Sequence, residues 1–257
     1  MTRLVVKELT VQFGGLVAID KLDFGVNPGT IHGLIGPNGA GKSTVFNCLS
    51  RYYEPVGGTI QFGDVDVLAL APHQVMGAGI ARTFQNVELF KGMTVLDNVL
   101  VGQHTAPGCN FFGDMFGVNS ARRGEKARKI AALESLEFLG IADTAHTYVN
   151  SLPYGKQKMV EFARALVSKP QVLLLDEPAA GLNPQETQHL GQLILELKKK
   201  LGITMLLVEH DMALVMGICD YITVMEFGRK IAEGLPADIR TNPAVIKAYL
   251  GEGEELA

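Results

Sequence analysis

The residues with the clearest chemistry form one glycine-rich segment near the amino terminus. Residues 36–43 match the pattern G-x-x-x-x-G-K-[ST] in full. Glycines in such a segment let consecutive backbone N–H groups turn toward phosphate oxygens, which side chains would otherwise obstruct. The lysine adds positive charge at the β- and γ-phosphates, and the serine hydroxyl is a magnesium ligand. The segment predicts a binding site for ATP with Mg²⁺, formed by Gly36, Pro37, Asn38, Gly39, Ala40, Gly41, Lys42, Ser43 and Thr44.

The sequence on either side supplies the context that a phosphate-binding loop needs. An apolar run at residues 31–35 predicts a strand that leads into the loop, and residues 43–49 read as the helix that follows it. The positive end of that helix dipole would face the phosphates. A glycine turn of purely structural use is the alternative, and the strand before and the helix after make it the weaker interpretation.

Two further polar groups follow apolar runs that predict buried strands. Asp176 and Glu177 come directly after residues 172–175, at the edge where parallel sheets of α/β proteins bind ligands. Asp176 can hold magnesium directly or through water, and Glu177 is the candidate for polarising an attacking water molecule. His210 follows the run at 205–208, where it is either a hydrogen-bonded structural histidine or a contact of the γ-phosphate.

For two other residues, the residue type alone allows both a functional and a structural interpretation. Gln85 lies where strand-rich sequence gives way to helical sequence, and a functional glutamine there cannot be separated from a polar boundary residue. Phe13 comes directly before two glycines, and it either stacks on adenine or belongs to the core. The core is the more common place for a phenylalanine.

Composition limits the classes of function. The chain has 257 residues, a formal charge of −4 and a pI near 5.9, so a nucleic-acid surface, which usually carries a basic excess, is not expected. Cys48, Cys109 and Cys219 lack a CxxC pair and predict reduced thiols. No signal-peptide pattern opens the chain, and no apolar run approaches the roughly 18 residues of a membrane span. We expect a cytoplasmic protein that reaches a membrane only through a partner.

The order of strands and helices predicts an α/β fold. Helices that alternate with short apolar strands favour a mainly parallel sheet covered on both faces. We expect a P-loop NTPase core, with an additional antiparallel β portion, built from 1–86 and 167–235. A mostly helical subdomain is expected at 87–166, and a C-terminal helix and tail at 236–257.

Two helices can be placed from their end signals. In the helical subdomain, an irregular excursion at 105–119 precedes a long helix capped by Ser120. Its expected inward face consists of Ile130, Leu133, Leu136 and Leu139. In the core, a helix is expected to open at Asn183 and Pro184 and to end at Gly202.

Five motifs in a fixed order resemble those of a known family. They are the glycine loop, Gln85, the segment Leu152-Pro153-Tyr154-Gly155-Lys156-Gln157, the segment Leu174-Leu175-Asp176-Glu177-Pro178, and His210. With these motifs the chain resembles an ABC-transporter ATP-binding subunit over essentially residues 4–250. The resemblance implies an ABC ATPase fold in which two subunits enclose two ATP molecules. Each ATP would lie between the phosphate loop of one subunit and the signature segment of the other.

The resemblance also implies roles for individual residues. Phe13 becomes the residue that stacks on adenine, and Gln85 becomes a magnesium ligand that couples the metal to the helical subdomain. Glu177 becomes the general base, and His210 the sensor of the γ-phosphate. Residues 85–93 would form the groove that receives a coupling helix of a membrane subunit.

The signature segment departs from the family pattern L-S-G-G-Q. Pro153 replaces the serine, Tyr154 the first glycine and Lys156 the glutamine. The hydroxyl that would meet the γ-phosphate in the partner is therefore missing. We expect this contact from backbone amides at Tyr154 and Gly155, or from elsewhere. Asn183 replaces the aspartate of the S-A-L-D segment, which bears on how the two ATP sites communicate.

These departures are similar to one subgroup, the ATP-binding subunits of branched-chain (hydrophobic) amino-acid importers. Residues 154–157, 177–184, 209–212 and 248–251 carry this finer resemblance. It implies a peripheral protein on the inner face of the cell membrane. Its partners would be a second ABC ATPase subunit, identical or different, integral membrane permease subunits and, indirectly, a periplasmic or extracellular solute-binding protein. The solute would be leucine, isoleucine, valine or a related small molecule.

Three alternatives differ from this interpretation in features of the sequence. The ATPase of the lipopolysaccharide exporter shares the stretch at 180–184, but its family tends to keep a Ser-Gly-Gly signature. A soluble ABC ATPase that acts on ribosomes or DNA usually has two cassettes or a long coiled coil, together with basic patches. Here the basic cluster at 122–129 reads as a solvated helix face. The third alternative is a module that binds nucleotide without hydrolysing it, and the presence of both Glu177 and His210 argues against it.

Overall fold

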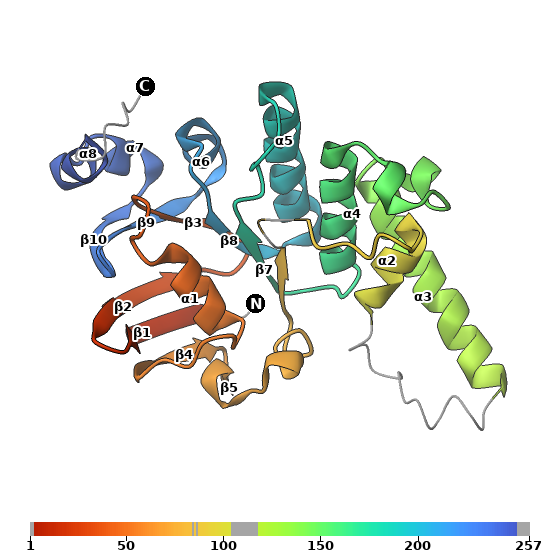
Figure 1. The fold of residues 1–257 in the computed structure, drawn as a ribbon, viewed down its shortest axis with the longest axis horizontal. Coiled ribbons are helices and arrows are strands. Elements are labelled where there is room, and N and C mark those ends of the chain that lie inside the picture. The colour runs from red at the N-terminus through yellow and green to blue at the C-terminus, as the bar shows by residue number, and fades with distance from the viewer. Residues whose placement is uncertain (1–2, 84, 86, 104–117, 251–257) are drawn as a thin grey trace. The chain divides into compact units, whose positions relative to one another are not determined.

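The computed structural model describes residues 3–83, 85, 87–103 and 118–250. Contacts within the chain divide it into two compact units, which are described separately (Figure 1). The first consists of Met1–Arg82 and Gln171–Ala257, and the second of Thr83–Pro170. The helical segment expected at 87–166 falls inside the second unit. None of the described helices is long and apolar enough to cross a membrane.

An antiparallel sheet forms one part of the first unit. It contains β1 (Leu4–Phe13), β2 (Leu16–Val26), β4 (Gly57–Phe62) and β5 (Val65–Asp66), in the order β2-β1-β4-β5. Leu4, Val6, Leu9 and Val11 of β1 are buried, whereas Lys7 and Glu8 are exposed. This arrangement is that of a sheet with one covered face.

A six-stranded sheet forms the centre of the first unit. Its strands are β3 (Ile31–Ile35), β6 (Ile80–Thr83), β7 (Val172–Asp176), β8 (Thr204–Val208), β9 (Tyr221–Glu226) and β10 (Arg229–Gly234), in the order β10-β9-β3-β8-β7-β6. Strand β3 pairs in parallel with β8 and β9, and β7 pairs in parallel with β8. Every residue of β3, β7 and β8 is buried, as expected of parallel strands covered on both faces. The carboxyl ends of β3, β7 and β8 therefore lie at one edge of the sheet.

Helix α1 (Lys42–Leu49) connects the two sheets through one hydrophobic core. Its buried side chains Val45, Phe46 and Leu49 belong to the same cluster as apolar residues of both sheets. Figure 1 shows α5 (Pro184–Leu201) and α6 (Met212–Ile218) on the face of the six-stranded sheet opposite to α1. Helices α7 (Pro236–Arg240) and α8 (Pro243–Leu250) contact β10. The predicted sheet is thus covered by helices on both faces.

Helix α5 begins and ends at the residues that the sequence predicts. The side chain of Asn183 accepts hydrogen bonds from the N–H groups of Gln185 and Glu186, both at 3.0 Å. Glu186 in turn accepts from the N–H of Asn183 at 2.9 Å, which completes a capping box. Gly202 ends the helix with φ of 64°, a conformation that glycine adopts without strain. The amide at position 183 therefore serves the local fold, whichever way the ATP sites communicate.

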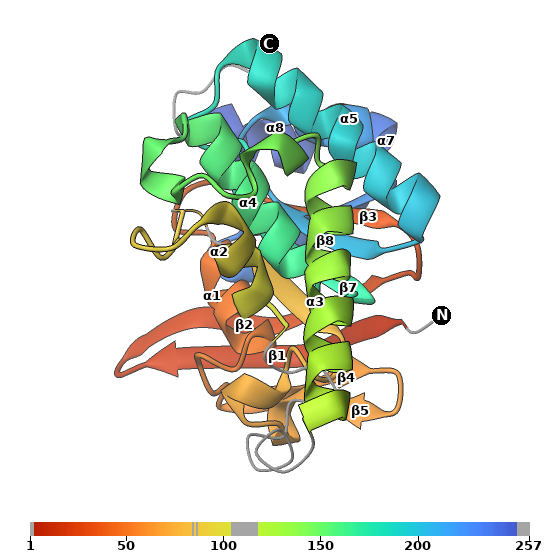
Figure 2. The same cartoon turned by 90° about the vertical axis from the view of Figure 1, so that its right-hand side faces the viewer.

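The second unit contains three helices that contact one another, α2 (Val95–Val101), α3 (Val118–Phe138) and α4 (Tyr154–Leu166) (Figure 2). Thr94 caps α2, and its side chain accepts a hydrogen bond from the N–H of Asp97 at 3.2 Å. The backbone of α2 comes close to α4 at Gly102, where an added Cβ would overlap the carbonyl oxygen of Arg164. Buried Asn98 bonds to both backbone groups of Phe90, which fixes the segment before α2.

The prediction for α3 was wrong in two respects. The helix begins at Val118, so Ser120 is inside it and does not cap it. Ala132 and Leu136 of the helix are buried, whereas Ile130 and Leu133 are exposed. Leu136, and Leu139 directly after the last helical residue, are buried as predicted. The buried position Ala132 was missed because the prediction considered only large apolar residues. Most of the expected excursion at 105–119 and Cys109 lie outside the described residues.

A buried histidine in the six-stranded sheet should make folding stability depend on pH. His32 of β3 is 1% exposed, and its Nε2 lies 2.9 Å from the Thr223 hydroxyl on β9. Burial lowers the pKa of His32 from 6.5 to about 4; Glu233 opposes this shift and Lys230 adds to it. The unfolded chain therefore takes up a proton as the pH falls through 6.5, while the folded chain takes it up only near 4.

The free energy of unfolding should therefore fall by about 2 kcal/mol between pH 7 and pH 5 because of this one group. His32→Gln can still bond to Thr223 but does not titrate, so its stability should lack this component. Urea unfolding of both proteins at the two pH values measures the difference. An identical pH dependence for the two would contradict the assignment.

Candidate functional site

The glycine loop connects β3 to α1, as the sequence predicts. Strand β3 ends at Ile35 and α1 begins at Lys42. The loop glycines Gly36, Gly39 and Gly41 have φ values of 150°, 76° and 100°, in the region that other residues rarely adopt. A Cβ at Gly36 would overlap the carbonyl oxygen of Met225, and one at Gly41 would lie 2.9 Å from that of Ala18. Glycine is required here by the neighbouring strands as well as by backbone conformation.

Lys42 holds its charge inside the loop. Its ammonium group donates hydrogen bonds to the carbonyl oxygens of Gly36, at 2.5 Å, and Pro37, at 2.8 Å. The side chain is buried, since the residue is only 5% exposed. A buried ammonium group next to the first turn of a helix produces a strongly positive local potential. Such a positive potential would stabilise a bound phosphate group.

A cavity of about 410 Å³ opens onto this loop. The loop and the first turn of α1 supply Asn38, Gly39, Ala40, Gly41, Lys42, Ser43 and Thr44 to its lining. Glu177 and His210 line it from the carboxyl ends of β7 and β8, and Leu16, Val17, Ala18 and Phe227 complete it. The structure thus brings most of the predicted phosphate-binding residues together with two of the predicted catalytic ones.

Glu177 and His210 contact each other at the edge of this cavity. The Nε2 of His210 lies 3.0 Å from Oε1 of Glu177. Glu177 has φ of 46°, an uncommon conformation for a residue with a side chain, and its N–H donates to the carbonyl of Val208 at 2.9 Å. Backbone strain of this kind persists where the surrounding structure imposes it, and it is concentrated at functional sites.

Glu209 organises the two loops that carry this pair, and its role was not predicted from the sequence. It is 4% exposed, and its carboxylate accepts a hydrogen bond from the N–H of Ala179 at 2.6 Å. It also accepts from the N–H groups of His210, at 2.9 Å, and Asp211, at 3.3 Å. The loop after β7 is therefore fixed to the loop after β8. The only sequence signal is an acidic residue placed directly before His210.

Arg82 makes a second connection that the sequence did not reveal. Its guanidinium forms an ion pair with Asp176 at 2.6 Å, and both side chains are nearly buried. The same guanidinium donates to the side chains of Asn47, at 2.9 Å, and Ser50, at 3.2 Å, on the last turn of α1 and its C-cap. It also lies over the ring of Phe46, 5.6 Å from the ring centre. Arg82 thus fixes the carboxylate at the end of β7 relative to α1.

Phe13 is not a core residue. It is 46% exposed, and its ring packs edge-on against Tyr53, with ring centres 5.1 Å apart. The interpretation of Phe13 as a core residue was therefore wrong. Phe13, Gly36, Pro37 and Asp176 are not among the residues that line the cavity. Stacking of Phe13 on adenine stays a prediction.

Three predicted residues, Gln85, Tyr154 and Gly155, belong to the second unit. Gln85 is exposed and lies in a bend. Tyr154 is the first residue of α4 and is also exposed, and the ammonium of Lys158 lies 5.7 Å from the centre of its ring. Pro153 is the N-cap residue of α4, so the substituted signature segment is compatible with a helix start. The assigned roles of these residues in ATP and magnesium binding stay predictions.

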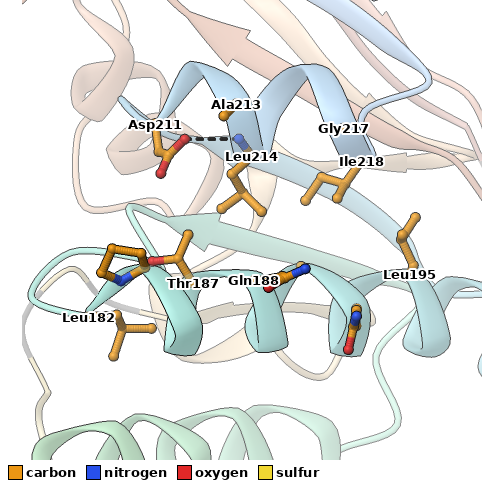
Figure 3. A pocket seen from close by; sticks show the side chains of 12 residues that line it. Leu182, Thr187, Gln188, Leu195, Asp211, Ala213, Leu214, Gly217 and Ile218 are labelled. Atoms are coloured by element: carbon orange, nitrogen blue, oxygen red, sulfur yellow. Dashed lines mark hydrogen bonds between the residues drawn. The ribbon is translucent and has the colours of Figure 1, made fainter.

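A larger hollow of about 540 Å³ lies between α5 and α6 (Figure 3), and the glycine loop is not part of its lining. Leu182, Leu195, Leu214 and Ile218 give it an apolar lining. Asp211 is its only charged lining residue, and this carboxylate caps α6 by accepting a hydrogen bond from the N–H of Leu214 at 2.9 Å. With no cationic group in its lining, this hollow is not suited to phosphate.

Comparison with known proteins identifies the family. A protein-family model described as ABC transporter matches residues 19–180. The chain belongs to the ABC transporter family. A second model, described as branched-chain amino acid ATP-binding cassette transporter, matches residues 229–255. The resemblance inferred from the five motifs is confirmed.

Several relatives match along nearly their whole length. The high-affinity branched-chain amino acid transport ATP-binding protein LivG of Escherichia coli (strain K12) is 47% identical over 249 residues, 97% of this chain and 98% of LivG. The corresponding protein BraF of Pseudomonas aeruginosa is 45% identical over the same shares. A probable LivG of Archaeoglobus fulgidus is 37% identical over 98% of this chain and 96% of its own.

Solved structures confirm the predicted fold class. The ADP conformation of an ATP-binding cassette of an ABC transporter superimposes with a TM-score of 0.84 at 32% identity, covering 98% of this chain and 99% of that one. A nucleotide-free cassette gives a TM-score of 0.83, also at 32% identity, over 97% and 99% of the two chains. This ABC transporter subunit is an ATPase with the P-loop NTPase core predicted from its sequence, and nucleotide is its ligand.

Proposed function

We propose that this ABC ATPase powers an importer of branched-chain amino acids or of a related small solute. The observation that supports this most strongly is the similarity to LivG and BraF, at 45–47% identity over 97% of the chain. The second family match, at residues 229–255, extends that similarity to the C-terminal segment. The relatives reported above are named for branched-chain amino acid transport, which favours this purpose over lipopolysaccharide export.

In this proposal the cavity at the glycine loop holds the phosphates of ATP. Lys42 and the backbone N–H groups of the loop neutralise phosphate charge. Glu177 accepts the proton of the water that attacks the γ-phosphorus, and its contact with His210 holds its carboxylate in place. His210, which lines the same cavity, is the proposed sensor of the γ-phosphate. Because both groups border one cavity, they can act on one nucleotide.

Ser43 in this cavity and Asp176, which directly precedes the lining residue Glu177, are suited to Mg²⁺. Mg²⁺ is usually bound by one or two protein groups, with substrate phosphates and waters completing its octahedral shell. In the described parts of the chain no three His, Cys, Asp or Glu side chains form a metal-binding group, so a site built wholly from protein is not expected. Ser43 and Asp176 of the first unit are the oxygen donors proposed to hold the ion, and a contribution from Gln85 stays a prediction of the family resemblance. When bound, it would neutralise charge on the phosphates.

The proposed partners complete the site and the transporter. Tyr154 and Gly155 would contact the ATP that is bound to a second ABC ATPase subunit. ATP hydrolysis would drive transport through integral membrane permeases, to which a solute-binding protein outside the membrane delivers the solute. The chain would therefore lie on the inner face of the membrane, attached through these permeases. No nucleic acid is part of this assembly.

Isolation of the native assembly tests this proposal. A tagged chain, extracted gently from membranes of its natural host, should co-purify with polytopic permeases and a second ATPase. Mass spectrometry identifies the partners, and the tag on an unrelated ATPase from the same host is the control. Lipopolysaccharide-export proteins, or ribosomal proteins without any permease, would refute the assigned purpose.

A further inference from the structure

The turn between β9 and β10 has an unusual residue at its tip. Glu226 pairs with Arg229 in the antiparallel ladder, so Phe227 and Gly228 form a two-residue hairpin turn. Both have positive φ, 45° for Phe227 and 77° for Gly228. Hairpin turns with two positive φ angles strongly favour Asn-Gly, Asp-Gly or Gly-Gly, because a side chain such as that of phenylalanine is strained there.

The fold does not account for a phenylalanine at this position. Phe227 is 84% exposed, so its ring contributes little to the core. A large apolar side chain that is both strained and exposed lowers stability, and residues of this kind are concentrated at binding sites. The exposed ring is therefore available to contact a ligand.

The turn is firmly attached to the glycine loop. The N–H of Gly228 donates to the carbonyl of Ala40 at 3.1 Å, and its carbonyl accepts from the N–H of Asp20 at 3.0 Å. A Cβ at Gly228 would lie 2.5 Å from the carbonyl oxygen of Ala18, so the turn packs directly on β2. Arg229 and Asp20 add an ion pair across the same junction. The tip is therefore held in a fixed position relative to the phosphate-binding residues.

The ring borders the cavity that contains those residues. Phe227 lines it together with Leu16 and Val17, which are also exposed apolar side chains, and with Lys42 and Ser43. One cavity thus combines a cationic, hydrogen-bonding group of residues with an apolar one. A nucleoside triphosphate has the same two parts, an anionic phosphate chain and a flat base with an apolar face.

We propose that Phe227 binds the base of the nucleotide by packing its ring against it. The proposal rests on the function proposed above and adds a residue that contributes to affinity for the nucleoside part of ATP. It is compatible with a second aromatic contact from Phe13, because the two residues lie on different segments. The strain at position 227 is then the consequence of presenting an aromatic ring at the mouth of the cavity.

Calorimetric titration of the purified chain with Mg²⁺-ATP and with Mg²⁺-tripolyphosphate tests the proposal. Loss of a base–aromatic contact in Phe227→Ala should weaken ATP binding by about fivefold to a hundredfold. Tripolyphosphate lacks a base, so its affinity should not change. Phe227→Trp keeps an aromatic ring and should bind ATP about as well as the unmodified chain does. Tyr148→Ala, which removes an exposed aromatic side chain of the second unit, is the matched control and should leave both affinities unchanged.

A second variant separates binding from folding. Phe227→Gly removes the ring and relieves the positive φ, so its melting temperature should rise while its affinity for ATP falls. Unchanged ATP affinity in both Phe227→Ala and Phe227→Gly would overturn the proposal. Equal weakening of ATP and tripolyphosphate would also overturn it, because the residue would then act on the loop and not on the base. If the unmodified chain binds tripolyphosphate but not ATP, the proposed function itself fails.

Discussion

Glu177→Gln is expected to bind ATP normally and to hydrolyse it about two to four powers of ten more slowly, the range for loss of a general base. Glutamine has nearly the same shape and can keep the contact with His210 Nε2, which is 3.0 Å in length for the glutamate. It cannot accept a proton from water. The substitution therefore changes the chemistry and leaves the strained backbone and the cavity as they are. Steady-state ATPase rates of the assembled transporter, with ATP affinity measured in parallel, give both quantities.

The matched control is Glu54→Gln, which removes a carboxylate from an exposed position outside the cavity lining. Its turnover should equal that of the unmodified protein. Near-normal turnover in Glu177→Gln would refute the assignment of the general base. Loss of ATP binding along with turnover would mean that Glu177 acts on the nucleotide and not on water.

Arg82→Ala should lower the free energy of unfolding by about 3–5 kcal/mol, the range for removal of one partner of a buried ion pair. The side chains of Arg82 and Asp176 are only 11% and 8% exposed, so the substitution leaves a carboxylate without compensation in a region of low dielectric. Arg82→Ala also removes the hydrogen bonds to Asn47 and Ser50 on α1 and its C-cap. Urea unfolding gives the loss of stability.

A double-mutant cycle separates the ion pair from the other contacts of Arg82. Asp176→Asn removes the charge that Arg82 compensates, so the double variant should be more stable than the sum of the two single effects predicts. Lys200→Ala breaks the exposed pair with Glu196, and its unfolding curve should match that of the unmodified chain. Strict additivity of Arg82→Ala and Asp176→Asn would contradict the coupling described here.

The parts of the site that could be predicted from the sequence are those set by local patterns. The glycine loop, the acidic pair after β7 and the ends of α5 depend on residues within a few positions of one another. Asn183, Glu186 and Gly202 show this clearly, because capping residues act on the backbone of their own helix turn. Their prediction needed no knowledge of the tertiary structure.

The parts that could not be predicted depend on contacts between distant segments. Arg82 and Asp176 are 94 positions apart, and Glu209 bonds to Ala179 across 30 positions. No periodicity or spacing marks such a pair in a single sequence. Phe227 was missed for a related reason, since it became noticeable only when the turn geometry and the neighbouring glycine loop were known. In α3 the apolar pattern was ambiguous, and packing selected Ala132 over Ile130 and Leu133 for the buried face.

The most direct test of the central claim is solute uptake into proteoliposomes. They would contain the purified transporter with this chain, ATP and Mg²⁺ inside, and the solute-binding protein with radiolabelled leucine, isoleucine or valine outside. We predict ATP-dependent uptake of at least one of these amino acids, and its loss when the chain carries Glu177→Gln. ATP hydrolysis without uptake of any of them, in vesicles where another small solute is taken up, would contradict the assigned substrate class. Equal uptake with the unmodified and Glu177→Gln chains would contradict the claim that hydrolysis at this site drives transport.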